Sequence, residues 1–344
     1  MFSAAALVGS LLTVAADHVS RRALASAGAA VVALCLLAFG ISPWFGGLLI
    51  SVVVWGAASD AVASGAEVAL VDVSGKHLTL ALGRQNFLGS LGDLLSPVVL
   101  VVAGIAHIGW RALFIGASLL MGGYAAWLGA EPIPPPSGES DSTVIGGILD
   151  VVRDFRVWML AAVEAALTIV DEPYLAFLIL FLERAQGVPV SLAALAAMAD
   201  LGGSAVGSFF APRLLRAHYR RWLVACGFGM PAAIAVLVLV PSLPVQYAAA
   251  AVSGACGAVV WVAVQALSLG LRPGRAGTTS AVISTIALPA LAFPVVAGLV
   301  ADHAGLPTAM ALYVAVTLAV AFLLVPLGRL RRADPGSTEA VELA

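Results

Sequence analysis

Charged residues are scarce in this sequence of 344 residues. Asp, Glu, Lys and Arg make up 10% of it, and Lys76 is its only lysine. Soluble globular domains carry roughly 25% charged residues. Hydrophobic residues make up 61%, and the mean hydropathy is +1.05. This composition excludes a soluble globular protein and predicts a chain that is embedded in lipid.

Residues that usually build catalytic or metal centres are also sparse. The three cysteines, Cys35, Cys226 and Cys256, lie far apart inside apolar runs, and the five histidines lie at the ends of such runs or in loops. This spacing does not suit metal ligation. A G-x-x-x-x-G-K-[ST] loop is absent, so we expect no direct coupling to ATP. The sequence therefore predicts no enzyme, no metal, no cofactor and no nucleic-acid partner.

Long apolar runs, by contrast, recur along the whole chain. A helix that spans a membrane needs about 20 mainly apolar residues. Eleven stretches meet this condition: 1–16, 23–42, 46–71, 85–106, 109–129, 156–181, 189–211, 222–241, 245–271, 278–301 and 305–327. The predicted fold is an all-α polytopic membrane protein with eleven transmembrane helices in a lipid bilayer.

The distribution of Lys and Arg over the loops predicts the orientation. If the spans alternate in direction, fifteen of the seventeen basic residues fall on one side, and only Arg111 and Arg184 fall on the other. Cytoplasmic loops carry the excess of Lys and Arg, so the first side and the C-terminus are predicted to be cytoplasmic. The dominance of Arg over Lys and the abundance of Ala favour a bacterial inner (plasma) membrane, and we expect a monomer.

A polar, proline-rich segment divides the chain. It reads "EPIPPPSGESDSTVIGGILD" at 131–150 and has the composition of a linker. The predicted domains are a bundle of five helices at 1–130, a cytoplasmic linker at 131–155, a bundle of six helices at 156–328 and a cytoplasmic tail at 329–344.

Short sequences recur between the two predicted bundles. "VGSLL" at 8–12 returns as "VGSFF" at 206–210, and Arg21-Arg22 returns as Arg220-Arg221, so the offset is 198 to 199 residues. Internal repeats of this kind are typical of transporters. The repeat leaves the helix at 156–181 without a counterpart. The chain is therefore either a true eleven-helix protein or, as we favour, a twelve-helix pattern whose first helix lies upstream of Met1.

The loop after the first span, together with the two-bundle organisation, resembles the major facilitator superfamily. The family signature G-x-x-x-D-R-x-G-R-R, preceded by another Gly, is matched by Gly9, Asp17, Arg21 and Arg22, and the sequence departs from it at Thr13, His18 and Ser20. The segments "SGAEVALVD" at 64–72, "GSLGDLLSP" at 89–97 and "GWRALFI" at 109–115 resemble later helices of the family. The resemblance implies a secondary transporter that works by alternating access, here with helices 2 to 12 of the twelve.

The same loop has a physical interpretation of its own. Asp17 at a helix C-terminus is unfavourable to the helix dipole, so it needs a basic partner such as Arg21 or Arg22, or the N-terminus of a neighbouring helix. Gly9, Asp17, Arg21 and Arg22 are therefore predicted to form a cytoplasmic gate loop. The alternative is that Arg21 and Arg22 only set the topology.

The ionisable residues inside the spans are all acidic, and such groups mark functional sites because they are costly in lipid. Four lie near the middle of their spans and are predicted to couple protons or bind substrate: Asp60, Asp171, Glu172 and Asp200. Three others, Glu67, Asp93 and Glu164, are predicted to serve gating or the cytoplasmic path. Without a basic residue in mid-span, these acids must be protonated, pair with a cationic substrate or face water. Each could instead be a structural acid that is hydrogen-bonded between helices.

Sequence around these acids makes further local predictions. Asn86, Ser90, Asp93 and Pro97 form a stripe at helical spacing that must face protein or water. Pro173 should bend or open its helix beside Asp171, and the glycines of "ADLGGSAVG" should allow close helix approach at Asp200. Four larger residues either line a cavity or simply pack: Trp55, Tyr174, Trp261 and Gln265.

Together these features predict a proton-coupled secondary transporter. The acidic bias favours an antiporter that exports a small lipophilic or cationic compound by efflux. An importer of a small nutrient or metabolite is the alternative within the same class. A non-transporting or degenerate membrane helix bundle is the alternative from another class.

Overall fold

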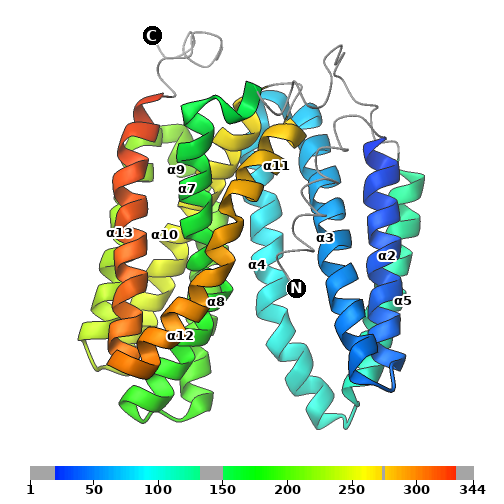
Figure 1. Cartoon of the computed structure of the whole chain (residues 1–344), viewed down its shortest axis with the longest axis horizontal. Helices are drawn as coiled ribbons and strands as arrows, with labels where there is room; N and C mark the ends of the chain where they lie inside the picture. The colour runs from blue at the N-terminus through cyan, green and yellow to red at the C-terminus, as the bar shows by residue number, and fades with distance from the viewer. Residues whose placement is uncertain (1–19, 132–149, 273–275, 331–344) are drawn as a thin grey trace. The chain divides into compact units, whose positions relative to one another are not determined.

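The computed structural model describes residues 20–131, 150–272 and 276–330. All its regular elements in these ranges are helical (Figure 1). They are α2 (Arg21–Ile41), α3 (Phe45–Ser74), η1 (Gly75–His77), α4 (Leu78–Ile105), α5 (Trp110–Ala130), α7 (Phe155–Ile169), α8 (Glu172–Leu180), η2 (Phe181–Ala185), α9 (Val190–Leu239), α10 (Leu243–Gly270), α11 (Ala276–Ala287), η3 (Leu288–Ala292), α12 (Phe293–Ala304) and α13 (Leu306–Leu330). The predicted all-α class is confirmed.

Nine helical stretches in this part of the chain are long and apolar enough to cross a membrane. The stretch that forms α9 covers two predicted spans, because two helices are joined across a kink at His218, where φ is −150° and ψ is 75°. Each predicted span from 23–42 onward overlaps one of these helices. The first predicted span, 1–16, lies outside the described residues, so the count of eleven stays a prediction.

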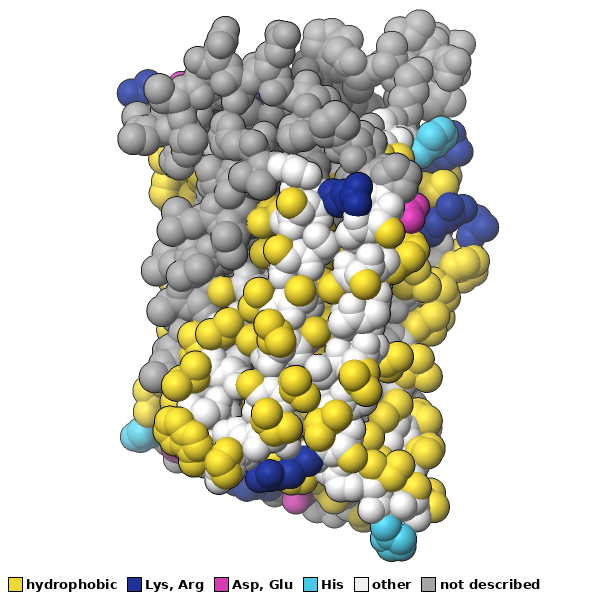
Figure 2. Space-filling view, turned by 90° about the vertical axis from the view of Figure 1, so that its right-hand side faces the viewer, with side chains coloured by type: hydrophobic (Ala, Val, Ile, Leu, Met, Phe, Trp, Pro, Cys, Tyr) yellow, Lys and Arg dark blue, Asp and Glu magenta, His cyan; other side chains and the backbone are white. Residues whose placement is uncertain are grey.

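The surface of the helices suits a lipid environment. On the face drawn in Figure 2, hydrophobic side chains cover the middle, whereas basic, acidic and histidine side chains lie toward the two ends. Among the described residues, large apolar side chains are strongly exposed, including Leu120 at 79% and Phe45 at 77%. An apolar belt of this extent would be unfavourable in water, which agrees with helices that face acyl chains.

The helices form two compact units. Unit 1 comprises Met1–Ala81, Leu95–Ala161 and Ala266–Leu288, and unit 2 comprises Leu82–Leu94, Ala162–Gln265 and Pro289–Ala344. Within unit 1, α2 packs between α3 and α5 (Figure 1). Gly28 allows this approach, since a Cβ there would lie only 3.1 Å from the Ala58 carbonyl oxygen. The predicted division into bundles at 1–130 and 156–328 stays a prediction.

Unit 2 is organised around the long helix α9. Helices α8 and α13 pack against it, and α12 packs against α13. Four aromatic rings from α8, α12 and α13 join these helices, with Tyr313 at 5.7 Å from Tyr174, 5.8 Å from Phe177 and 5.3 Å from Phe293, measured between ring centroids. The segment Leu82–Leu94 of α4 also belongs to this unit, and there the Phe87 ring lies 5.4 Å from the Phe209 ring of α9, measured between centroids.

Helices α9 and α10 approach closely through glycines, as predicted for the stretch around Asp200. A Cβ at Gly203 would overlap the carbonyl oxygen of Ala251, and one at Gly254 would overlap the carbonyl oxygen of Asp200. Small residues allow backbones to approach in this way, which favours van der Waals packing inside a membrane. The contact fixes the position of Asp200 relative to α10.

A break separates α7 from α8, also as predicted. Helix α7 ends at Ile169, α8 begins at Glu172, and Asp171 between them has φ −92° and ψ −124°. Pro173 lies in the first turn of α8. Proline lacks an amide hydrogen and crowds the preceding turn, so the helix cannot continue through this point. The break leaves Asp171 at the junction of two helices.

Two side-chain contacts join the ends of neighbouring helices. Within unit 1, Arg272, just after α10, forms an ion pair of 3.6 Å with Asp154, directly before α7. Within unit 2, the Gln246 side chain in the first turn of α10 donates to Gln186, directly after η2, at 3.0 Å. The predicted orientation of the spans stays a prediction.

Candidate functional site

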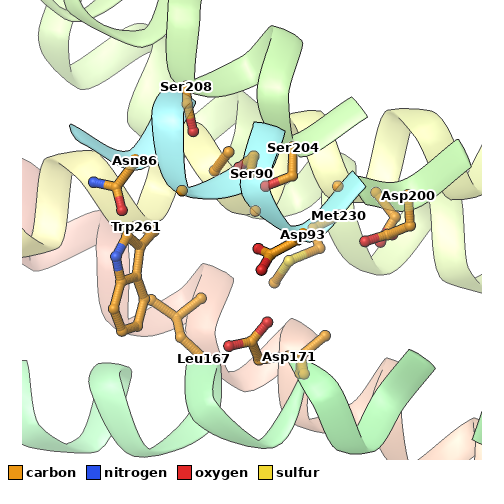
Figure 3. Close-up of a pocket in the computed structure, with 16 residues that line it drawn as sticks. Asn86, Ser90, Asp93, Leu167, Asp171, Asp200, Ser204, Ser208, Met230 and Trp261 are labelled. Atoms are coloured by element: carbon orange, nitrogen blue, oxygen red, sulfur yellow. The ribbon is translucent and has the colours of Figure 1, made fainter. Parts of the chain in front are cut away.

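A pocket of about 300 Å³ opens inside unit 2 (Figure 3). Residues from α4, the α7–α8 break, α9 and α10 line it. Its polar lining consists of Asn86, Ser90, Asp93, Asp171, Asp200, Ser204, Ser208 and Ser253. Its volume lies at the lower end of the range typical of small-molecule sites.

Three carboxylates meet in this pocket: Asp93 of α4, Asp171 at the helix break and Asp200 of α9. Figure 3 shows Asp93 and Asp171 pointing toward one another. Asp171 is close enough for electrostatic repulsion with both of the others. Within the residues that the structure describes, no Lys, Arg or His lines the pocket. The described lining therefore gathers three carboxyl groups without a basic partner.

The three carboxylates differ in their surroundings. Asp93 and Asp171 are exposed, whereas Asp200 is only partly exposed. One oxygen of Asp200, Oδ1, is completely buried, and no hydrogen-bond partner for it exists among the described residues. Ser253 of α10 lies beside the Asp200 carboxylate. Asp200 is thus the enclosed acid of the set, and Asp93 and Asp171 are the open ones.

The polar stripe on α4 faces the pocket, which confirms the prediction for three of its members. Asn86, Ser90 and Asp93 line it, whereas Pro97 does not. The Asn86 amide donates to the Gln265 side chain at 2.9 Å and to the Leu82 carbonyl at 2.9 Å. These bonds fix the orientation of Asn86 at the edge of the site.

The pocket also has an apolar lining. It includes Leu167 of α7, Met230 of α9 and Trp261 of α10, and Figure 3 shows Leu167 beside Trp261 and Met230 beside Asp93. Trp261, which the sequence left open between lining a cavity and packing, lines the pocket. A lining of this kind provides a surface for the hydrophobic part of a ligand.

Other acids singled out in the sequence do not line this pocket. Glu172 is exposed in the first turn of α8, and Glu164 and Glu67 are partly exposed on α7 and α3, each with an interaction of its own. Asp60 lies in α3, and its side chain is outside the described set. The roles predicted for these four residues stay predictions.

Only one side chain of the predicted gate loop is described. Gly9 and Asp17 lie outside the described residues, and Arg21 opens α2 without a described side chain. The Arg22 guanidinium donates to the carbonyl oxygen of Gly129, which ties the start of α2 to the end of α5 inside unit 1. The gating role of the loop stays a prediction.

Several residues that line the pocket are not among the site residues predicted from the sequence. Ser204 and Ser208 follow Asp200 by four and eight positions, so helical periodicity alone places them on the same face as the acid. Ser253 and Met230 gave no such signal, because their roles depend on how α9 and α10 pack. Among the described residues, no cluster of three or more His, Cys, Asp or Glu side chains suits a metal ion.

Comparison with known proteins identifies the family to which this architecture is similar. The model of the Major Facilitator Superfamily matches residues 1–171. No curated protein matches the chain in sequence. The fold is similar to that of the human organic anion transporter MFSD10 (TETRAN), with a TM-score of 0.74, 19% identity and coverage of 94% of this chain and 82% of the other. It is also similar to the E. coli fucose:proton symporter FucP (N162A), with a TM-score of 0.72, 16% identity and coverage of 95% and 90%.

Proposed function

Because this chain belongs to the major facilitator superfamily, we propose that it is a proton-coupled antiporter that exports a small lipophilic or cationic compound. It is a multi-pass membrane protein with the fold of secondary transporters. Transport proceeds by alternating access, in which the bundles predicted at 1–130 and 156–328 rock about a central site. The basic loops and the C-terminus face the cytoplasm of a bacterial inner membrane.

The observation that carries the proposal is the charge of the pocket. Asp93, Asp171 and Asp200 lie together without a basic residue among the described lining. Carboxylates that repel one another in a low-dielectric site are stabilised by a proton or by a cationic ligand. A site that binds either protons or a cationic ligand can exchange one for the other across the membrane, as an antiporter does.

In this proposal the three acids have different functions, according to how exposed they are. Asp93 and Asp171 are open to the pocket and bind the cationic centre of the substrate, while Asp200 is enclosed and holds the proton. Trp261 offers its ring face to the same cation. Leu167 and Met230 contact the apolar part of the substrate.

The pocket argues against an anionic substrate for this chain. One similar structure is that of an organic anion transporter, but an anion would meet three carboxylates here. Like charges at close range cost free energy, so the specificity of that protein does not extend to this one. The identity with it is 19%, at which the fold alone is shared.

Inverted membrane vesicles test the proposal. With the interior acidified, wild-type vesicles should accumulate ethidium, and the accumulation should collapse when an uncoupler is added. Asp171→Asn should lower the initial rate by at least about tenfold, since it removes one ligand of the cation. Glu183→Gln is the control, because this exposed acid of η2 does not line the pocket.

Three results would contradict the proposal. If an imposed proton gradient moves no ethidium, the chain is not an exporter of lipophilic cations. If the gradient drives uptake from the opposite face only, the chain is an importer. If Asp171→Asn transports at the wild-type rate, the pocket is not the coupling site.

A further inference from the structure

Three sulfur-containing side chains come together beside the pocket, where the second helical part of α9 meets α10. They are Cys226 and Met230 of α9 and Cys256 of α10, and all three belong to unit 2. Cys226 and Met230 are four positions apart, after the kink at His218, so they share one face of the helix. The proposed function gives the two thiols no role.

The Cys256 sulfur lies directly against the backbone of α9. A Cβ at Gly229, which is three residues after Cys226, would be only 2.9 Å from Cys256 Sγ. Residues three apart on a helix are neighbours, with about 5–6 Å between their Cβ atoms. The two sulfur atoms therefore lie within one helical turn of each other, and the thiols are close enough to interact directly. Both cysteines are free thiols.

The thioether of Met230 connects this pair to the pocket. A Cβ at Gly257, which follows Cys256 in the chain, would lie 3.4 Å from Met230 Sδ. Met230 and Gly257 both line the pocket, whereas the two cysteines do not. Figure 3 shows Met230 beside Asp93. A cation in the pocket can therefore contact a carboxylate and the thioether together, and the thiols lie on the same two helices.

The chemistry of these three ligands selects a particular class of ion. Thiolate and thioether sulfur are soft ligands that suit Cu(I), whereas Mg²⁺, Ca²⁺ and Mn²⁺ prefer oxygen. A structural Zn²⁺ site holds four ligands in a tetrahedron. Among the described residues, His, Cys, Asp and Glu form no group of three that suits a metal ion. Cu(I) and Ag(I) accept fewer ligands than Zn²⁺, and sulfur alone is sufficient for them.

We propose that Cys226, Met230 and Cys256 form a binding site for a soft monovalent metal ion, Cu(I) or Ag(I), between α9 and α10. One thiol loses its proton to water in the pocket as its sulfur binds the ion. The second thiol and the thioether bind as neutral ligands, and no electron is transferred. The ion thus replaces a proton, so no net charge is added between the helices, where an uncompensated charge would be costly.

The spacing of the cysteines in the sequence does not predict this site. Cys226 and Cys256 are 30 positions apart, and no His or further Cys follows either of them at the spacing of a metal-binding motif. Helix α9 ends at Leu239 and α10 begins at Leu243, so the chain turns back within a few residues. The packing of these two helices brings the sulfur atoms together.

Titration of the purified full-length protein with Ag(I) in chloride-free buffer tests the inference. Ag(I) is a redox-inert probe, and calorimetry gives its dissociation constant. Cys226→Ala and Cys256→Ala should each weaken binding by at least about a hundredfold, because a soft ion loses a thiol ligand. Met230→Leu keeps the size of the side chain and should weaken binding by about tenfold, since it removes only the thioether.

Cys35→Ala is the matched control. It removes the remaining cysteine of the chain, a buried thiol of α2 in unit 1, and it should bind Ag(I) like wild type. Thermal unfolding without metal checks that each variant is folded. Ag(I) should raise the Tm of wild type and Cys35→Ala, because a ligand that binds only the folded state stabilises it. It should not raise the Tm of Cys226→Ala or Cys256→Ala.

X-ray absorption at the copper edge identifies the ligands. Protein loaded with Cu(I) should show sulfur neighbours only. Oxygen neighbours would place the ion on the carboxylates of the pocket and overturn the inference.

Other results would also overturn it. If Cys226→Ala and Cys256→Ala bind Ag(I) like wild type, or if Cys35→Ala loses the binding, the ion does not lie between α9 and α10. Equal affinities for wild type and Met230→Leu would exclude the thioether and with it the site of three sulfur ligands. Zn²⁺ binding as tight as that of Ag(I) would contradict the class of ion. None of these measurements involves transport, so this inference and the proposed function can fail independently.

Discussion

The carboxylates of the pocket are all aspartates, yet they meet water to different extents. Asp93 and Asp171 are exposed, whereas Asp200 has an oxygen with no accessible surface and no described partner. The free energy of a charge depends strongly on its solvation. Identical residue types therefore differ in their surroundings, and the proposed function uses this difference by assigning the cation to the open pair and the proton to the enclosed acid.

The sequence predicts a coupling role for two of these acids and a role in the cytoplasmic path for the third. Asp171 and Asp200 lie in the middle of their predicted spans, whereas Asp93 lies in the cytoplasmic half of its span. Helical spacing already grouped Asp93 with Asn86 and Ser90 on one face of α4. Which neighbour that face meets could not be predicted, because periodicity defines a face but not its partner.

At the residue scale, Trp261 gives a direct test of cation binding. Trp261→Ala should raise the KM for ethidium by about tenfold, since a cation over an indole ring contributes roughly 0.5–2 kcal/mol. Trp261→Phe should have a smaller effect, because it keeps an aromatic face. Initial rates in inverted vesicles at several ethidium concentrations provide the measurement.

Trp55→Ala is the control for this substitution. Trp55 is a tryptophan of α3 that does not line the pocket, and it is 39% exposed, so its removal should leave the KM unchanged. A wild-type KM in Trp261→Ala would show that the ring does not contact the substrate.

At the element scale, the contact between α9 and α10 determines where Asp200 lies. Gly203 and Gly254 allow the backbones to approach so closely that any side chain would collide with a carbonyl oxygen of the opposite helix. Asp200 lies three residues before Gly203, Ser253 lies directly before Gly254, and both line the same pocket. The close approach therefore brings a carboxylate and a hydroxyl together across two helices.

Two adjacent glycines allow this contact to be measured. Gly203→Ala should destabilise the protein by about 1–3 kcal/mol, because the new methyl group would overlap the Ala251 carbonyl and force the helices apart. Gly202→Ala is the matched control, since a Cβ there meets open space and alanine favours helix. Thermal unfolding in one detergent should give a lower Tm for Gly203→Ala only, and equal Tm values would show that the contact is not tight.

The break between α7 and α8 belongs to the same scale. It was predicted from Pro173, whose missing amide hydrogen and fixed ring act on the preceding turn whatever the tertiary context. The structure shows the consequence of the break: Asp171 lines the pocket, whereas Glu172 does not. Two adjacent acids thus differ in position because a helix begins between them.

At the scale of the whole molecule, the topology predicted from Lys and Arg can be tested with single cysteines. Glu131, after α5, and Asp302, near the end of α12, are both exposed and lie on opposite sides in the predicted topology. In intact cells, a membrane-impermeant thiol reagent should label Asp302→Cys but not Glu131→Cys. The three native cysteines lie inside helices, so wild-type protein controls for background.

The opposite labelling pattern would invert the predicted orientation. Equal labelling of both variants would contradict alternation of the spans between the two sites. Labelling of Glu131→Cys after the cells are made permeable confirms that the variant is present and reactive.

The positions of the helices could largely be predicted from the sequence alone. A backbone in lipid must satisfy its hydrogen bonds internally, and a helix does so within a single apolar stretch. The positions of the spans, the break at Pro173 and the polar face of α4 follow from such short-range rules, and the helices of the structure agree with them.

Tertiary structure decided which polar groups meet. Asp93, Asp171, Asp200 and Ser253 lie on four separate segments, yet all four line one pocket. Their meeting depends on the rotation and spacing of packed helices, which result from the sum of many small contacts between surfaces far apart in the chain. A local sequence pattern does not include these long-range contacts. The sequence could therefore suggest individual residues of the site, but only the folded structure shows how they are arranged.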